Sequence, residues 1–160
     1  YAPTGVNAPS VHLSLVATRR KMDEIRQITY DCLKTVRADS PLFIIKEMAE
    51  ASSKVGKDLV YRGAPALVAA SVDTKTAASV CQTVDPVIAL SYLELYAASL
   101  GLGTVWDGIA VALAREFPEI EAQFQIPQGC KLSFLMALGI PDISYQRTPQ
   151  RTTDRITIIR

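Results

Sequence analysis

Side chains that could perform acid–base or nucleophilic catalysis are sparse in this sequence. Its one histidine, His12, falls in a segment whose pattern predicts a strand, where a structural role is the commoner one. A Ser-His-Asp or Cys-His pair would have to use that residue, and the Gly-x-Ser-x-Gly turn that presents a nucleophilic serine is absent from the sequence. The acidic residues lack the spacing of metal ligands, and Cys32, Cys81 and Cys130 lie far apart. The sequence therefore points to no catalytic side chain and no metal site.

Glycine and proline turns are the remaining features that could support chemistry. They lie at residues 2–7, at 101–108 and at 147–151, and the last of them carries arginines. The glycines at 101 and 103 follow a predicted helix rather than a strand, so they do not match the dinucleotide-binding fingerprint. Gly108 is followed by Ile109 instead of the lysine of a phosphate loop. Such a protein either binds a molecule or lets a cofactor perform the chemistry.

The stretch from 85 to 108 is the segment around which these turns are organised. Asp85 is expected to be the N-cap of a helix, with Pro86 in its first turn and Gly101 at its end. The helix carries one charge, Glu94, and apolar side chains on all sides, which is typical of a buried helix. It is too short and too polar to span a membrane. The turn that follows could bring backbone close to a flat ligand, although a core helix followed by a strand is the simpler interpretation.

The other predicted elements alternate between strands and helices. Strands are predicted over 11–17, 66–72 and 130–138, and helices over 19–36, 41–57, 74–82, 109–116 and 118–124. Because the segment 66–72 is almost continuously apolar, its strand should be covered on both faces. This order predicts a single domain in which helices cover a sheet, either α/β or α+β. The stretch 156–159 has strand character without a partner nearby in sequence and could pair with another subunit.

The composition argues against two classes of partner. Apolar residues make up 49% of the 160 residues, charged residues make up 21%, and the net charge is +1. Since the lysines and arginines are scattered, the sequence shows no basic patch that would bind nucleic acid or a membrane surface. Three unpaired cysteines indicate a reducing compartment, so we expect a cytoplasmic location.

Four segments carry a joint pattern that none of them carries alone. Residues 2–7 (APTGVN) resemble a Pro-Ser-x-x-Asn loop, and residues 61–68 (YRGAPALV) resemble an Ala-Pro turn into a core strand. Residues 101–108 (GLGTVWDG) form the most characteristic block, and residues 139–141 with 147–151 (RTPQR) resemble a closing Gly-x-Pro and basic tail. In this order and spacing, over nearly the whole chain, they resemble the nitroreductase family of FMN-dependent oxidoreductases.

The resemblance implies that FMN is the cofactor. The loop at 2–7 would lie against a flavin bound mainly by the partner subunit, and the turn at 105–108 would lie at the isoalloxazine ring. There a backbone N–H near Gly108 would reach the flavin N5, with the carboxylate of Asp107 beside it. Arg147 and Arg151 are both candidates for the phosphate, which a guanidinium suits well. A solvated tail for the arginines and a core position for Trp106 are the simpler alternatives. The cofactor-binding residues implied are Pro3, Thr4, Gly5, Asn7, Val105, Trp106, Asp107, Gly108, Arg147 and Arg151.

The resemblance also implies a fold and an activity. The fold is α+β, with a central mixed β-sheet flanked by helices in three layers, in an intertwined homodimer with FMN at the subunit interface. The apolar helix over 86–100 would be the helix buried between the subunits. The activity is electron transfer from NADH, NADPH or ferredoxin through the flavin to a nitroaromatic, a quinone or a similar acceptor. Other branches of the family dehalogenate or dehydrogenate their substrates. Residues 37–53 are expected to form part of a lid.

One departure from the family pattern concerns the start of the chain. The family usually carries an Arg-x-Ser-x-Arg segment before the Pro-Ser-x-x-Asn loop, and this sequence starts at Tyr1, after that segment should have ended. We therefore expect residues 1–160 to form one nitroreductase-like FMN-binding domain without that segment. Either residues that precede Tyr1 in the gene are missing or cleaved here, or the protein lacks this part of the flavin site. Each charged hydrogen bond lost with it would cost about 1.5–3 kcal/mol. The alternative function is a truncated or degenerate dimer that acts as a non-catalytic binding module.

Overall fold

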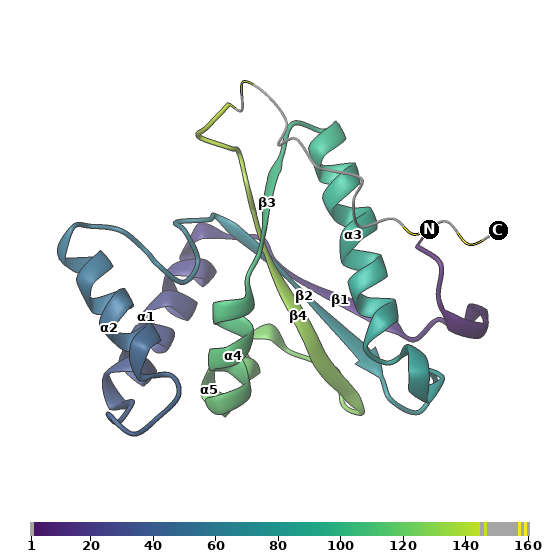
Figure 1. Ribbon diagram of the computed structural model, residues 1–160, viewed down its shortest axis with the longest axis horizontal. Helices are drawn as coiled ribbons and strands as arrows, with labels where there is room; N and C mark the ends of the chain where they lie inside the picture. The colour runs from purple at the N-terminus through teal and green to yellow at the C-terminus, as the bar shows by residue number, and fades with distance from the viewer. Residues whose placement is uncertain (1, 145, 147–156, 158, 160) are drawn as a thin grey trace.

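A four-stranded sheet forms the centre of the computed structural model, which describes residues 2–144, 146, 157 and 159 (Figure 1). The strands are β1 (Val11–Val16), β2 (Ala66–Asp73), β3 (Gly103–Trp106) and β4 (Cys130–Gly139), in the spatial order β1-β2-β4-β3. The expected α+β class is confirmed. A mixed sheet was expected, whereas the three strand pairs in the described part of the chain are antiparallel. The strand expected over 156–159 lies largely outside the described residues.

Helices cover the two faces of the sheet, so the expected three layers are present (Figure 1). The helices α1 (Arg19–Thr35), α4 (Gly108–Glu116) and α5 (Pro118–Glu121) lie on one side, with α2 (Phe43–Lys54) beyond α1. The other face carries α3 (Val84–Ser99). The segment predicted as a helix over 74–82 is instead a turn and a short 3-10 helix, Ser79–Cys81, because the Asp73 carboxylate binds the Lys75 N–H and the Thr76 hydroxyl.

The strand β2 supplies both hydrophobic cores, as its continuous apolar run predicted. Its residues Leu67 and Ala69 face the larger core, which lies against α1, α4 and α5. Its residues Val68 and Ala70 face a smaller core with Leu90 of α3. Alternation of side chains along a strand therefore delivers one apolar residue to each core in turn.

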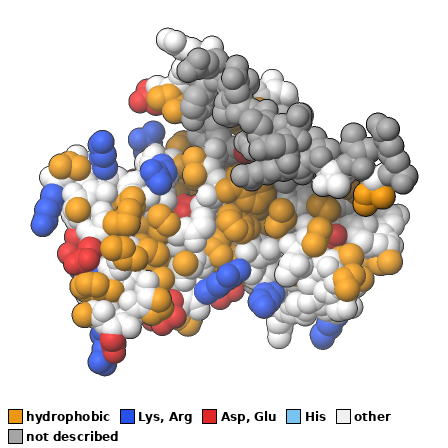
Figure 2. All heavy atoms as spheres, viewed as in Figure 1, with side chains coloured by type: hydrophobic (Ala, Val, Ile, Leu, Met, Phe, Trp, Pro, Cys, Tyr) orange, Lys and Arg blue, Asp and Glu red, His pale blue; other side chains and the backbone are white. Residues whose placement is uncertain are grey.

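The helix α3 is apolar on all sides, as predicted, but it is buried on one side only. Asp85, Pro86, Leu90 and Ala97 are buried against the rest of the chain. The opposite side, which we call the outer face of α3, is solvent-exposed in the single chain. Figure 2 shows hydrophobic side chains scattered over the face of the molecule that it draws, with a group of them near its middle. The outer face consists of Val84, Val87, Tyr92, Leu95 and Tyr96, together with Leu100, the residue that caps the C-terminal end of α3. The prediction of a buried helix therefore holds for one side of α3 in a single chain, and the other side is the one that the expected burial between subunits would cover.

Among the described residues, no helix combines the length and the hydrophobicity needed to cross a lipid bilayer.

Candidate functional site

The junction between β3 and α4 is built around Asp107. Its Oδ1 accepts the Ala110 N–H at 2.9 Å, which makes Asp107 the N-cap of α4, and its own N–H donates to the Leu135 carbonyl at 2.9 Å. The side chain is 4% exposed, and Oδ2 has no hydrogen-bond partner among the described residues. Burial raises the pKa of this carboxyl to about 6, and the charge of Asp58 adds to that effect, although the Ala110 N–H and Arg62 lower the pKa.

The residue after Asp107 leaves open space at the start of α4. A Cβ placed on Gly108 would meet no atom within 4 Å. The first N–H groups of a helix have no partner inside it, so the backbone here can donate to a ligand at close range. An anionic or electron-rich edge is favoured at this end of a helix. The junction therefore offers exposed backbone donors beside a buried carboxyl group.

The side chain of Glu94 fixes β3 against α3. Its Oε2 accepts the indole N–H of Trp106 at 2.9 Å, and its Oε1 accepts the hydroxyl of Thr104 at 3.2 Å. The ring of Trp106 also packs edge-on against Phe134, with 5.2 Å between the ring centroids. The side chain of Trp106 thus packs into the smaller core, which agrees with the alternative that this residue has a core position. Its backbone leads into the turn at 105–108.

A cleft of about 530 Å³ lies between the 62–65 turn, β3 and the end of β4, and Val105 lines it. Two glycines allow its walls to approach each other. A Cβ on Gly139 would lie 2.9 Å from Pro65, and a Cβ on Gly103 would lie 3.2 Å from Pro141. The Ala-Pro and Gly-x-Pro segments singled out in the sequence are therefore packed against each other here.

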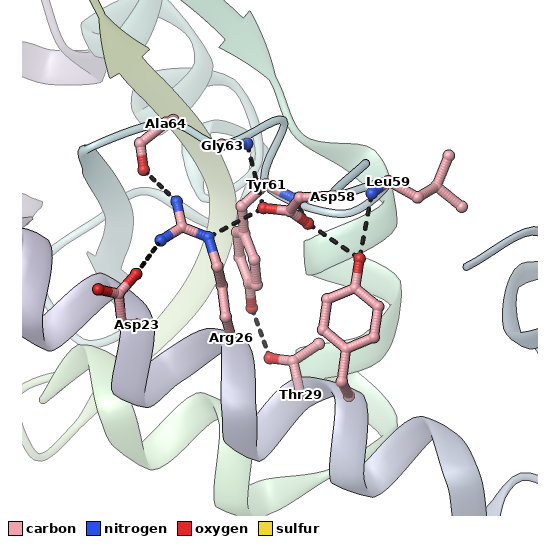
Figure 3. Close-up of polar contacts among 9 residues, drawn as sticks. Asp23, Arg26, Thr29, Asp58, Leu59, Tyr61, Gly63 and Ala64 are labelled. Atoms are coloured by element: carbon pink, nitrogen blue, oxygen red, sulfur yellow. Dashed lines mark hydrogen bonds and ion pairs between the residues drawn. The ribbon is translucent and has the colours of Figure 1, made fainter. Parts of the chain in front are cut away.

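The 58–65 segment is held by the carboxylate of Asp58, which sequence reasoning missed (Figure 3). Oδ2 accepts from Arg26 Nε at 2.9 Å and from the Gly63 N–H at 3.1 Å. Oδ1 accepts from the Tyr30 hydroxyl at 3.0 Å and from the Tyr61 N–H at 3.1 Å. Burial alone would raise the pKa of Asp58, but these bonds outweigh it and lower the pKa below its ordinary value.

The guanidinium of Arg26 extends the same network to both sides (Figure 3). It donates to the Ala64 carbonyl and lies 2.6 Å from the Asp23 carboxylate. The neighbouring hydroxyl of Thr29 lies 2.7 Å from that of Tyr61, whose side chain is wholly buried. Together these contacts tie α1 to the wall of the cleft.

The loop at 2–7 is attached to α3 rather than to β3. The Gly5 N–H donates to both carboxylate oxygens of Asp85, at 3.0 and 3.1 Å. The prediction that Asp85 is the N-cap of this helix is wrong: Thr83 is the residue before the first turn, and the carboxylate binds a distant N–H instead. The residues after Gly5, Val6 and Asn7, adopt left-handed backbone conformations with φ of 49° and 55°.

The structure joins residues 105–108 in one turn but does not bring them together with the loop at 2–7 in one chain. The loop is bound at Asp85 and β3 is bound at Glu94, nine residues further along α3. Nine helical residues span about 14 Å. This separation is compatible with the expectation that the loop serves a flavin held by the partner subunit. Arg147 and Arg151 lie outside the described residues.

A family model for nitroreductases matches residues 1–140. The chain belongs to the nitroreductase family. A search of curated proteins found no match. Among solved structures, a nitroreductase with bound FMN from Bacteroides fragilis superposes with a TM-score of 0.75 at 21% identity, over 100% of this chain and 81% of that one. A nitroreductase with bound FMN from Desulfitobacterium hafniense gives 0.72 at 20% identity, over 99% and 80% of the two chains.

A third solved structure has a different activity on the same fold. Iodotyrosine deiodinase bound to FMN and 3-iodo-L-tyrosine superposes with a TM-score of 0.61 at 22% identity, over 99% of this chain and 79% of that one. At such identities the likeness establishes the nitroreductase fold, and the reaction has to be argued from the residues of this chain.

Replacing Asp107 with Asn is expected to stabilise the FMN-free protein above pH 7. Because the pKa of Asp107 is raised to about 6 in the folded state, ionisation of this group lowers the free energy of unfolding of the wild type as the pH rises from about 4 to about 6. The loss is complete above about pH 6. The asparagine side chain cannot ionise, and its oxygen can still cap α4. In urea unfolding at pH 8, the free energy of unfolding of the variant should be about 1–2 kcal/mol higher than that of the wild type. The gain is limited to this range because the new amide also lacks a hydrogen-bond partner. At pH 4 the gain should vanish. An Asn variant less stable than wild type at pH 8 would contradict this account.

Proposed function

We propose that this nitroreductase-family protein is an FMN-dependent oxidoreductase that accepts electrons from NADH, NADPH or ferredoxin. It would pass them to an electron-poor acceptor such as a nitroaromatic or a quinone. FMN, when bound, supplies the hydride-accepting ring and the electron transfer. The observation that carries the proposal is the turn at Asp107 and Gly108, where open backbone donors lie beside a buried, partly unsatisfied carboxyl group in a chain of this family.

The residues present fit a flat, hydrogen-bonding ligand. The absence of a side chain at Gly108 leaves room for a ring edge, while Oδ2 of Asp107 is buried beneath this turn without a partner among the described residues. We infer that the N–H groups at the start of α4 orient the flavin ring and that Val105, 45% exposed, supplies an apolar wall. With a pKa of about 6, the carboxyl of Asp107 can hold a proton at Oδ2 close to neutral pH.

The remaining cofactor contacts are proposed from two other segments. The loop with Pro3, Thr4, Gly5 and Asn7 would contact the flavin of the partner subunit, and the exposure of Pro3 and Asn7 leaves them accessible for this contact. One of the two tail arginines would bind the phosphate. The full proposed set is Pro3, Thr4, Gly5, Asn7, Val105, Trp106, Asp107, Gly108, Arg147 and Arg151, with Trp106 acting through its backbone and its packing.

A second copy of the chain is the proposed occupant of the outer face of α3. Leu95 and Tyr96 are 72% and 68% exposed there, and large apolar side chains at such exposure favour a protein interface. The exposed Leu13 and Leu15 of β1 pair with Ala70 and Val68, whose side chains face α3, so they widen the same apolar side of the sheet. A homodimer would bring the loop at 2–7 of one chain towards the turn at 105–108 of the other.

The visible absorption spectrum of the purified protein tests the proposed function. We expect a flavin double band in the native protein and free FMN after denaturation. Anaerobic addition of NADH, and separately of NADPH, should bleach that band with the donor that the protein uses. A protein that stays colourless after incubation with FMN would contradict the proposal and favour the non-catalytic binding module.

A further inference from the structure

The carboxylate of Asp85 is buried without a cation. It is 2% exposed, and within the part of the chain that the structure describes it makes no ion pair. Its partners are the Gly5 N–H, which reaches both oxygens, and the Ser10 hydroxyl at 3.4 Å from Oδ2. The first turn of α3 favours a negative charge at this position. A buried carboxylate is costly unless hydrogen bonds replace its contacts with water. Because the Gly5 N–H supplies two of the few contacts that Asp85 has, the loop is held where this N–H can reach the carboxylate.

The loop that Asp85 binds has an unfavourable backbone shape that its own side chains do not hold in place. Val6 is β-branched and has φ of 49°, a conformation that such residues rarely adopt. Its side chain is 82% exposed, so packing does not compensate for the strain. Two backbone bonds close the turn, from the Asn7 N–H to Thr4 and from the Ala8 N–H to Gly5, both at 3.1 Å. A strained segment persists only where contacts outside it determine its shape.

The packing around Gly5 fixes the same point from a second side. A Cβ on Gly5 would lie 2.8 Å from Cβ of Cys81, in the 3-10 helix just before α3. Only glycine can therefore approach Cys81 closely enough for its N–H to reach Asp85. The hydrogen bonds and the close approach together anchor the turn to the start of α3, with Val6 and Asn7 facing solvent.

From this geometry we propose that Asp85 is a positioning residue that holds the loop at 2–7 in the shape required to contact FMN. The proposal rests on the proposed function, because FMN is the ligand. Asp85 does not touch the cofactor. It acts through the Gly5 N–H and sets where Thr4 and Asn7 lie relative to α3, the helix whose outer face is the proposed dimer interface. A shift of the loop on its own helix would therefore become a shift against the partner's flavin.

The test compares Asp85→Asn, Asp85→Ala and the control Asp31→Ala, whose carboxylate is exposed on α1. Amide hydrogen exchange measured by NMR on the FMN-free protein reports the tether directly. We expect protection of the Gly5 amide to fall at least tenfold in Asp85→Ala and less in Asp85→Asn, whose amide oxygen still accepts one bond. Protection in the middle of α3 and in the control should stay unchanged. Unchanged exchange at Gly5 in Asp85→Ala would overturn the proposal.

FMN titration then connects the tether to the cofactor. The dissociation constant, measured by quenching of flavin fluorescence, should rise about 10- to 100-fold in Asp85→Ala and by a smaller factor in Asp85→Asn. The control should bind as the wild type does. Folded variants that bind FMN as tightly as the wild type would overturn the positioning role. If wild-type protein fails to bind FMN, the proposed function fails instead, and the exchange experiment still decides whether Asp85 holds the loop. If Asp85→Ala does not fold, the graded loss in Asp85→Asn decides the question.

Discussion

Replacing Leu95 with Glu is expected to convert the proposed dimer into a monomer and to abolish stable FMN binding. Leu95 is 72% exposed on the outer face of α3, next to Tyr96. In a two-fold dimer the same surface of both chains is buried, so one substitution places two carboxylates in the interface. A carboxylate buried there without a partner costs several kcal/mol in each chain, which is comparable to the free energy of many interfaces. Light scattering coupled to gel filtration measures the molecular mass.

Loss of FMN is expected in the same variant because the site is proposed to use both chains. The loop at 2–7 and the turn at 105–108 are bound about 14 Å apart along α3 in one chain. Only a second copy would bring the loop of one chain to the turn of the other. The visible spectrum after dialysis against FMN-free buffer should therefore lose its flavin band together with the dimer mass.

A matched control separates the interface from a general effect of surface charge. Val55, which follows α2, is 69% exposed, so Val55→Glu adds the same charge at a similar exposure away from the outer face of α3. This variant should remain dimeric and retain FMN. A Leu95→Glu protein that stays dimeric and yellow would show that the outer face of α3 is covered by something other than a second copy, or by nothing.

The periodicity of apolar residues predicted most of the fold because those residues face the chain's own cores. The helix predicted over 19–36 is α1, Arg19–Thr35, and Met22, Ile25 and Leu33 are its buried apolar residues. The strand predicted over 66–72 is buried along almost its whole length, as a continuous apolar run requires. Periodicity does not distinguish burial within one chain from burial against another. At α3 it therefore predicted an evenly apolar helix correctly, but it could not say that one side of that helix would be exposed in a single chain.

The candidate site was predictable only in part, because its polar contacts join residues far apart in sequence. The turn at 105–108 was found from the resemblance, and its glycine does leave open space. Asp85 followed by Pro86 has the local pattern of an N-cap, yet its carboxylate binds Gly5, 80 positions away. Local capping rules cannot foresee a distant N–H that competes for the same oxygens. Arg26 shows the same limit, since it lies among charged neighbours that are typical of a solvated helix face.

Replacing Asp58 with Ala is expected to lower the free energy of unfolding by about 3–5 kcal/mol, the range measured when a buried ion pair loses one partner. The side chains of Arg26 and Asp58 are only 18% and 16% exposed, so water does not replace the lost carboxylate well. The partly buried Tyr61 N–H also loses its acceptor, whereas the Gly63 N–H is exposed and can bind water instead. An unsatisfied buried donor costs about 1–3 kcal/mol, so the Tyr61 N–H adds to the loss without changing its range.

The pH dependence distinguishes loss of this carboxylate from a general packing defect. Because hydrogen bonds lower the folded-state pKa of Asp58, its contribution to stability is present above the unfolded pKa and is lost as the pH falls through the folded pKa. The difference between wild type and Asp58→Ala, measured by urea unfolding, should therefore be full at pH 7 and shrink below about pH 4, the ordinary Asp value. Asp31→Ala, which removes an exposed pair with Lys34, should leave the free energy of unfolding close to that of the wild type. A difference for Asp58→Ala that is equally large at pH 3 would mean that the lost volume, rather than the charge that ties α1 to the cleft wall, sets the stability of this segment.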